Sequence, residues 1–322
     1  MTICQRRIFA LLKGHLAALA MVALAACDPA LPPLVQPVPT PPARPALTSL
    51  PPAASAESEA MRAYLASVQA DLLTQGLLRT DGGGVDAPYT DRMLADNFIR
   101  VALFDEYQRT PAGLVQRETQ SRLRRWNVPV RVGLHFGNSV PAERRATDRA
   151  RVASYLARLQ QITGHPIALA DSGANFLLYF VNEDERRALG PVIAAALPDL
   201  SGAEIDGLTN LPRSTYCIVY ALSDGASSVN SRAFAIIRAE HPDLLRLSCI
   251  HEEIAQGLGL ANDSPSARPS IFNDDEEYAL LTTQDEAMLS MLYNPALRPG
   301  MTVTEARPIV QSIAAILLGG ES

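Results

Sequence analysis

The sequence predicts an α+β fold in which a mixed sheet lies beneath two long helices. Three apolar segments of strand length supply the sheet: residues 128–136, 176–181 and 216–222. Two segments with apolar residues at helical spacing, 141–163 and 244–258, supply the helices. Because long helices alternate with short strands and no internal repeat is visible, we expect helices packed on one sheet.

The chain begins with the features of a secretory signal peptide. Basic residues, among them Arg6 and Lys13, precede an apolar run over residues 16–26 that is too short to span a bilayer. The run ends in L-A-A-C at residues 24–27, which closely resembles a bacterial lipobox. The resemblance implies removal of the signal peptide, residues 1–26, and lipidation of Cys27. The protein would then be anchored in the bacterial cell envelope and face the periplasm, since acyl chains contribute ~0.8 kcal/mol per buried CH₂. The alternative is an ordinary secretory signal with a chance cysteine.

Three further regions follow the signal peptide. Residues 27–56 contain the lipidated cysteine and a linker rich in proline, alanine and threonine, a composition typical of a semi-rigid spacer without a core. Residues 57–89 form an N-terminal helical segment, which a glycine-containing loop ends. Residues 90–322 form the main domain, with Thr90 as the cap of its first helix.

Three segments of the main domain have a less distinct pattern. Residues 233–237 are expected to form a short edge strand before the 244–258 helix. The arginine-rich stretch 117–151 is interpreted as solvated helix faces; a stripe that binds lipid headgroups or anionic wall polymers is the alternative. The acidic run 274–277 is expected to be the solvated start of a helix, since acids suit that end of the helix dipole. It lacks the spacing of an EF-hand loop.

Composition excludes several classes of chemistry. Lys13 is the only lysine and is lost with the signal peptide, so no P-loop, Schiff base or Ser-Lys dyad remains. No G-x-S-x-G motif is present. Nucleic acid is not expected as a partner in the envelope.

Two cysteines, Cys217 and Cys249, remain in the mature chain once Cys27 is lipidated. In an oxidising compartment we predict a disulfide between them. Two buried free thiols are the alternative.

The segment around Gly259 resembles the active-site helix of zinc proteases of the HExxH type. In those enzymes two histidines lie four residues apart, a glutamate follows the first, and a glycine bend leads to a third ligand. With Gly259 at the bend, Glu252 and Gln256 occupy the helical ligand positions, Glu253 the general-base position and Asn262 the third ligand position. One carboxylate and two amide oxygens are too hard and too weakly charged to hold zinc tightly. Calcium or magnesium is the alternative.

A second register, starting at His251, fails because Ala255 then occupies the second ligand position. Adjacent helical residues point about 100° apart, so His251 and Glu252 do not share a face. We expect His251 to be an exposed or capping residue.

Sequence blocks beyond this helix carry two family resemblances. Residues 281–293 resemble the closing helix of matrixin-type metzincins, which implies a zincin-like mixed sheet. Together with the segment around Gly259, residues 270–274 and 299–302 resemble the bacterial family DUF2927, from about residue 90 to residue 301. That family is named for having no known function.

We therefore predict a lipid-anchored envelope protein with a degenerate, non-catalytic zincin-like domain that needs no cofactor. Its cleft, lined by Glu252, Gln256, Asn262 and Asp263, would bind a peptide or a cell-wall component. The alternative is a peptidase-like hydrolase with Glu253 as general base and a divalent metal on Glu252, Gln256 and Asn262. In a binding module, the amide of Gln256 is expected to bond to Glu252 or Glu253. A structural role without any ligand is a third interpretation.

Overall fold

The computed structural model describes residues 54–110, 113–223 and 227–319, all of which belong to one compact unit, Leu50–Ser322. The predicted signal peptide and the lipidation site Cys27 lie outside the described residues. Among those that are described, no helix has the length and apolar character needed to cross a bilayer.

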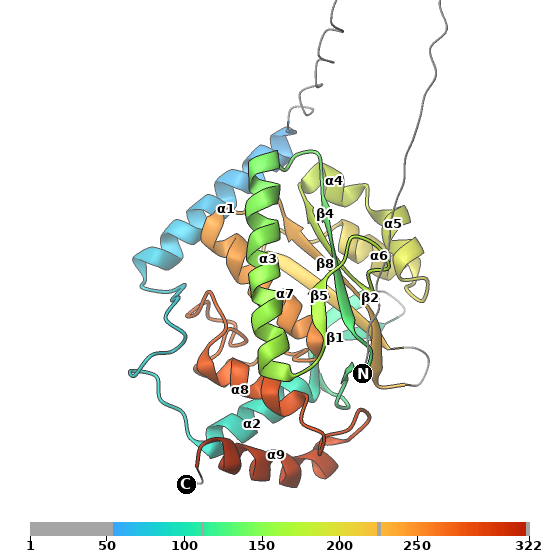
Figure 1. Ribbon diagram of the computed structural model, residues 1–322. Helices are drawn as coiled ribbons and strands as arrows, with labels where there is room; N and C mark the ends of the chain where they lie inside the picture. Colours follow the sequence, from blue (N-terminus) through green and yellow to red (C-terminus); the bar gives the residue numbers. More distant parts are fainter. Residues whose placement is uncertain (1–53, 111–112, 224–226, 320–322) are drawn as a thin grey trace, which may run out of the picture. The chain divides into compact units, whose positions relative to one another are not determined.

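The unit is built on a mixed six-stranded sheet (Figure 1). Five strands run parallel in the order β3 (Arg125–Trp126), β8 (Val229–Arg238), β6 (Phe176–Val181), β4 (Val130–Phe136) and β5 (Ile167–Leu169). The sixth strand, β7 (Cys217–Ser223), pairs antiparallel with β8. The α+β prediction and its three apolar strands are confirmed.

The prediction of an edge strand over residues 233–237 is wrong. These residues are the second half of β8, which pairs with β6 on one side and with β7 on the other. All five side chains are exposed by 2% or less, as expected for an apolar run covered on both faces of a sheet. The strand looked short because Asn230, Ser231 and Arg232, which precede the run, are polar.

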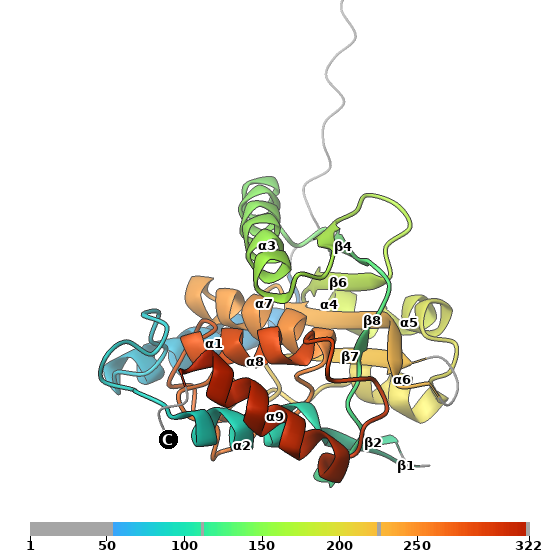
Figure 2. The same ribbon diagram turned by 60° about the horizontal axis from the view of Figure 1, so that its bottom comes forward.

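Helices cover both faces of the sheet, so the fold has three layers (Figures 1 and 2). On one face, α3 (Ala142–Thr163) and α7 (Asp243–Leu258) share a core with Phe176, Leu178 and Phe180 of β6. The other face packs against two short helices, α5 (Gly190–Ala196) and α6 (Gly202–Thr209), while the short helix α4 (Glu183–Arg187) follows β6 in the chain. The two long helices confirm the prediction, whereas the short ones were not predicted.

The remaining elements flank this core. They are α1 (Ala56–Thr74), α2 (Asp91–Ala102), the hairpin of β1 (Phe104–Thr110) and β2 (Gly113–Gln120), α8 (Thr283–Leu292) and α9 (Val303–Leu317). Thr90 caps α2 as predicted, because its hydroxyl accepts a hydrogen bond from Met93 N at 3.2 Å. The hairpin forms a sheet of its own and was not predicted.

The arginine-rich stretch 117–151 is only partly helical. Four of its nine arginines lie on α3, and three of these form ion pairs: Arg144 and Arg151 with Asp243, and Arg149 with Asp171. The other five lie on β2, β3, β4 and the loop before β3, so the interpretation as solvated helix faces holds only for the start of α3.

Candidate functional site: an acidic cleft along strand β7

A cleft of about 680 Å³ lies where α7, β7 and the β1–β2 hairpin come together. Residues 214–223, which include all of β7, line one side of it. The end of α7 and the loop residues that follow, up to Asp263, line another side, and Asp274 and Glu276 complete it. The cleft therefore contains the segment that the sequence singled out.

The sequence of α7 explains which side chains face the cleft. Ile250, Ile254 and Leu258, spaced at intervals of four residues, are fully buried in the core. Glu253 and Gln256 fall on a different face of the helix and line the cleft. This division follows directly from the helical period.

The helix ends at the glycine bend that the sequence predicted. Gly259 has a φ of 130°, in the region that favours glycine. A Cβ at this position would lie 2.3 Å from the backbone oxygen of Arg124, so no larger residue fits without displacing backbone. The bend turns the chain back so that Asp263 joins Glu253 and Gln256 in the cleft.

A close approach at Gly257 fixes α7 on the sheet. A Cβ there would lie 2.5 Å from the ring of Phe176 in β6. The carbonyl oxygen of Gly257 accepts a hydrogen bond of 2.8 Å from the indole N–H of Trp126, a residue of β3 that is 1% exposed. The helix that carries the acidic side chains is thus seated directly on the central strands.

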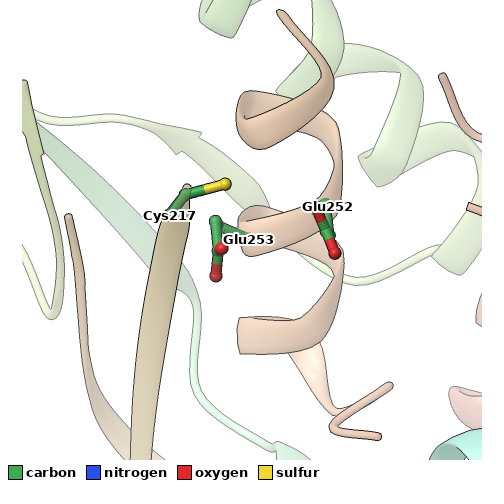
Figure 3. Close-up of side chains that lie close together, drawn as sticks. All are labelled: Cys217, Glu252 and Glu253. Atoms are coloured by element: carbon green, nitrogen blue, oxygen red, sulfur yellow. The ribbon is translucent and has the colours of Figure 1, made fainter. Parts of the chain in front are cut away.

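The predicted disulfide is confirmed: Cys217 of β7 is bonded to Cys249 of α7, with their Cα atoms 5.9 Å apart. It links two walls of the cleft. One sulfur atom of this bond lies near two carboxyls, since Cys217 Sγ and one oxygen each of Glu252 and Glu253 all lie within 4.8 Å of one another. Figure 3 shows Glu253 between α7 and β7, beside Cys217. Because this sulfur is in a disulfide, it offers no thiolate to a metal.

Seven carboxyl groups line the cleft. Asp105 pairs with Arg124, whereas the other six form no ion pair with any residue that the structure describes. These six are Glu106, Glu252, Glu253, Asp263, Asp274 and Glu276. Burial is the main cause that raises the pKa of each, and nearby carboxyls raise it further. The pKa values of Glu106 and Glu276 rise to about 7.

Two amides partly satisfy this cluster. Gln256 Nε2 donates to Asp263 Oδ1 at 3.0 Å, and Gln116 Nε2 donates to Glu106 Oε1 at 3.2 Å. Glu253 is different: the residue is 3% exposed, and its Oε2 has no hydrogen-bond partner among the described residues. A buried carboxylate oxygen without a partner is costly, so this atom indicates a missing ligand or a bound proton.

Asn262 does not join the other residues that the sequence placed in the cleft. Its Nδ2 donates to the backbone oxygen of Arg100 at 3.0 Å, and its own N–H donates to Val101 O at 3.1 Å. The side chain therefore holds the chain against the end of α2. Glu252, Glu253, Gln256 and Asp263 do come together.

His251 is buried, contrary to the prediction of an exposed or capping residue. It is 7% exposed, and its ring stacks on Tyr155 of α3 with 4.0 Å between centroids. Its Nδ1 accepts a hydrogen bond of 3.4 Å from Leu281 N, and burial lowers its pKa to about 3. The helical period sends His251 into the core between α3 and α7, while the next residue, Glu252, lines the cleft.

The acidic run 274–277 starts no helix, so that prediction is also wrong. Asp274 and Glu276 adopt positive φ values of 63° and 57° in a loop, and both line the cleft. Backbone bonds from Leu78 to Glu276 and from Arg79 to Glu277, each 2.8 Å, hold the loop in place. Glu277 instead pairs with Arg268 at 2.6 Å.

The donors in the cleft do not fit zinc. Catalytic zinc sites in proteins draw most of their affinity from imidazole or thiolate ligands. None of the histidines in the described part of the chain lines this cleft, and Cys217 is in a disulfide. Carboxyl, amide and hydroxyl oxygens are left, and oxygens are the donors that hard cations prefer.

Glu106, Asp274 and Glu276 were missed as site residues from the sequence. Glu106 lies on the unpredicted hairpin. The alternation of Asp274 and Glu276 within the acidic run was the only available signal, because every second residue there faces the cleft.

Comparison with known proteins assigns a family and no activity. A family model described as a protein of unknown function (DUF2927) matches residues 91–312. No curated protein and no solved structure matches the chain.

Proposed function

The chain belongs to the DUF2927 family, and from that premise we propose that it is a lipid-anchored, periplasm-facing protein with a non-catalytic, zincin-like binding cleft. Its ligand is an extended peptide or a peptide-containing wall component. The L-A-A-C sequence at residues 24–27 supports the anchor.

The edge of β7 is the observation that carries the binding proposal. In the described part of the chain, β7 pairs with β8 alone, and the cleft runs along residues 214–223. The outward N–H and C=O groups of an edge strand can pair with an extended peptide, which adds to the sheet as a further strand. The cleft beside β7 has room for the side chains of such a peptide.

The zincin-like assignment is supported by the same arrangement. An antiparallel edge strand, β7, lies beside a helix, α7, that ends in a glycine bend at Gly259. The positions expected to bind metal carry Glu252 and Gln256, and Gln256 is already bonded to Asp263. Burial raises the pKa of Glu253 well above its usual range, and nearby carboxyls raise it further.

Photocrosslinking tests the binding proposal. A photoreactive residue replaces Ala221 on β7 in one variant and the exposed Ala153 on α3 in a control variant. We expect only the Ala221 variant to form an adduct with a peptide or wall fragment in the envelope, identified by mass spectrometry. The same compound, once purified, should slow amide hydrogen exchange in β7. Equal labelling by both variants, or unchanged exchange in β7, contradicts the proposal.

The unpartnered oxygen of Glu253 favours one other candidate, a metal-dependent hydrolase in which Glu253 activates water. Elemental analysis and a peptidase assay on the purified full chain distinguish it. We expect no stoichiometric zinc and no hydrolysis. A chelator-sensitive activity that Glu253→Gln removes would establish the hydrolase instead.

A further inference from the structure

We propose that the acidic cleft contains a calcium site, in which side-chain oxygens of Glu252 and Glu253 bind the ion and Asp263 adds negative charge beside them. This inference deepens the proposed function, because it concerns the same cleft. It does not depend on the identity of the peptide or wall ligand.

The two glutamates of α7 have the spacing that a shared ion requires. One oxygen of Glu252 and one of Glu253 lie within 4.8 Å of each other. Calcium binds oxygens at about 2.3–2.6 Å, so two of its ligands lie at most about 5 Å apart. A single ion between these two carboxylates meets this limit without a change of backbone.

The buried oxygen of Glu253 indicates that something is bound there. Its Oε2 has no partner among the described residues, the residue is 3% exposed, and it points from α7 toward β7 (Figure 3). A buried carboxylate oxygen is normally paired with a hydrogen-bond donor or a cation. No described residue supplies either to Glu253 Oε2. A small cation fits beside this buried oxygen of Glu253, which a large ligand does not reach.

Asp263 adds charge to the site because the bend at Gly259 returns it to the same cleft. Its charge raises the pKa values of both Glu252 and Glu253. Gln256 Nε2 holds one oxygen of Asp263 at 3.0 Å, which orients the carboxyl.

The donor chemistry selects calcium among the available cations. All donors are oxygens, which excludes a preference for zinc. The two carboxylates are neighbours on one helix, so water or other oxygens complete an irregular set of ligands. Calcium tolerates irregular coordination, whereas magnesium requires a nearly ideal octahedron. Glu106, Asp274 and Glu276 surround the site and add negative charge.

Direct titration of the full chain in detergent with CaCl₂ tests the site. We expect one calcium per chain, with a dissociation constant of about 10⁻⁴–10⁻³ M, as in extracellular calcium modules. Terbium should bind at the same place and luminesce through energy transfer from the cleft tyrosines Tyr107, Tyr216 and Tyr220. Calcium should displace it.

Two variants and one control assign the ligands. Glu253→Gln and Glu252→Gln should each weaken calcium binding at least tenfold, while Glu143→Gln on the exposed start of α3 leaves it unchanged. Circular dichroism confirms that each variant is folded. If the folded Glu253→Gln variant fails to bind terbium, Glu253 is a ligand, even where the heat of calcium binding is too small to measure by titration.

Three results overturn the proposal. These are the absence of calcium binding to the folded wild-type chain at millimolar concentration, full binding by the Glu253→Gln variant, and tighter binding of zinc than of calcium. Binding of a basic peptide to the cleft without binding of calcium counts as the first of these results. Photocrosslinking at Ala221 is performed with chelator present, so failure of the calcium site and failure of the proposed function are separate outcomes.

Discussion

Gln256 and Asp263 are joined across the glycine bend by a hydrogen bond of 3.0 Å, from the amide Nε2 to the carboxyl Oδ1. The sequence predicted Glu252 or Glu253 as the partner of this amide. The bend at Gly259 brings Asp263 back to the helix, and Asp263 takes the bond instead. Glu253 is consequently left with an unpartnered oxygen.

Stability should fall as the pH rises through the range in which the cleft carboxyls ionise. Burial raises the pKa of Glu106 from 4.5 to about 7, so the folded chain keeps a proton that the unfolded chain has released. Stability is therefore greatest below about pH 4.5 for this group and declines toward pH 7. Glu106→Gln should remove part of this decline and stabilise the chain at neutral pH by roughly 1 kcal/mol, since one pKa unit is worth 1.36 kcal/mol. Urea unfolding with chelator present measures it.

The control for this experiment is Glu143→Gln, which removes a carboxyl from the exposed start of α3. It should leave the slope of stability against pH unchanged. A Glu106→Gln variant with the same slope as the wild-type chain would mean that this carboxyl is solvated in the cleft.

Gly259→Ala should destabilise the fold by about 3 kcal/mol or more, because a positive φ strains alanine and its Cβ meets the backbone of Arg124. Gly164→Ala is the matched control. Gly164 also has a positive φ, 65°, but a Cβ there meets nothing within 4 Å, so only about 1–2 kcal/mol is expected. Equal losses in the two variants would show that the contact with Arg124 is not decisive.

Removal of the disulfide should cost about 3–4 kcal/mol by the chain-entropy model, because Cys217 and Cys249 close a loop of 32 residues. The double variant Cys217→Ala with Cys249→Ala avoids the burial of a hydroxyl. Denaturant unfolding of this variant should match that of the wild-type chain in reductant. Two titratable thiols in unfolded, unreduced wild-type protein would disprove the bond.

Cys27→Ser should move the protein from the membrane pellet to the soluble envelope fraction, because acyl chains on Cys27 are the expected anchor. Cell fractionation with immunoblotting measures this. A Cys4→Ser variant serves as control and should remain in the pellet, since Cys4 lies within the expected signal peptide. Retention of the Cys27→Ser variant after a high-salt wash would rule out lipid anchoring.

Local pattern was sufficient to predict the main helices and three strands. The 176–181 strand and the helix beginning after Pro141 have strong periodicity and clear boundaries, and both are present. The hairpin was not predicted, because the sequence F-D-E-Y-Q-R-T of β1 is polar on both sides of its alternation. The position of β8 in the sheet could not be predicted either, since strand order depends on contacts between distant segments.

The site could be predicted only as far as one helix extends. Glu252, Glu253, Gln256 and Asp263 followed from the resemblance to the zinc-protease helix, which also placed Asn262 in the cleft, where it does not lie. Glu106, Asp274 and Glu276 come from segments far apart in the sequence, and tertiary packing alone brings them together.

The packing at Gly257 gives the cleft one fixed wall and one adjustable wall. The absence of a side chain at Gly257 lets α7 lie directly against Phe176, and Trp126 donates a hydrogen bond to the carbonyl oxygen of Gly257. The disulfide ties α7 to β7. The opposite wall, the β1–β2 hairpin, shares no strand pairing with the main sheet in the described residues. We therefore expect the larger displacement on binding at the hairpin, which is held by packing and not by strand pairing, while α7 keeps its position on β6.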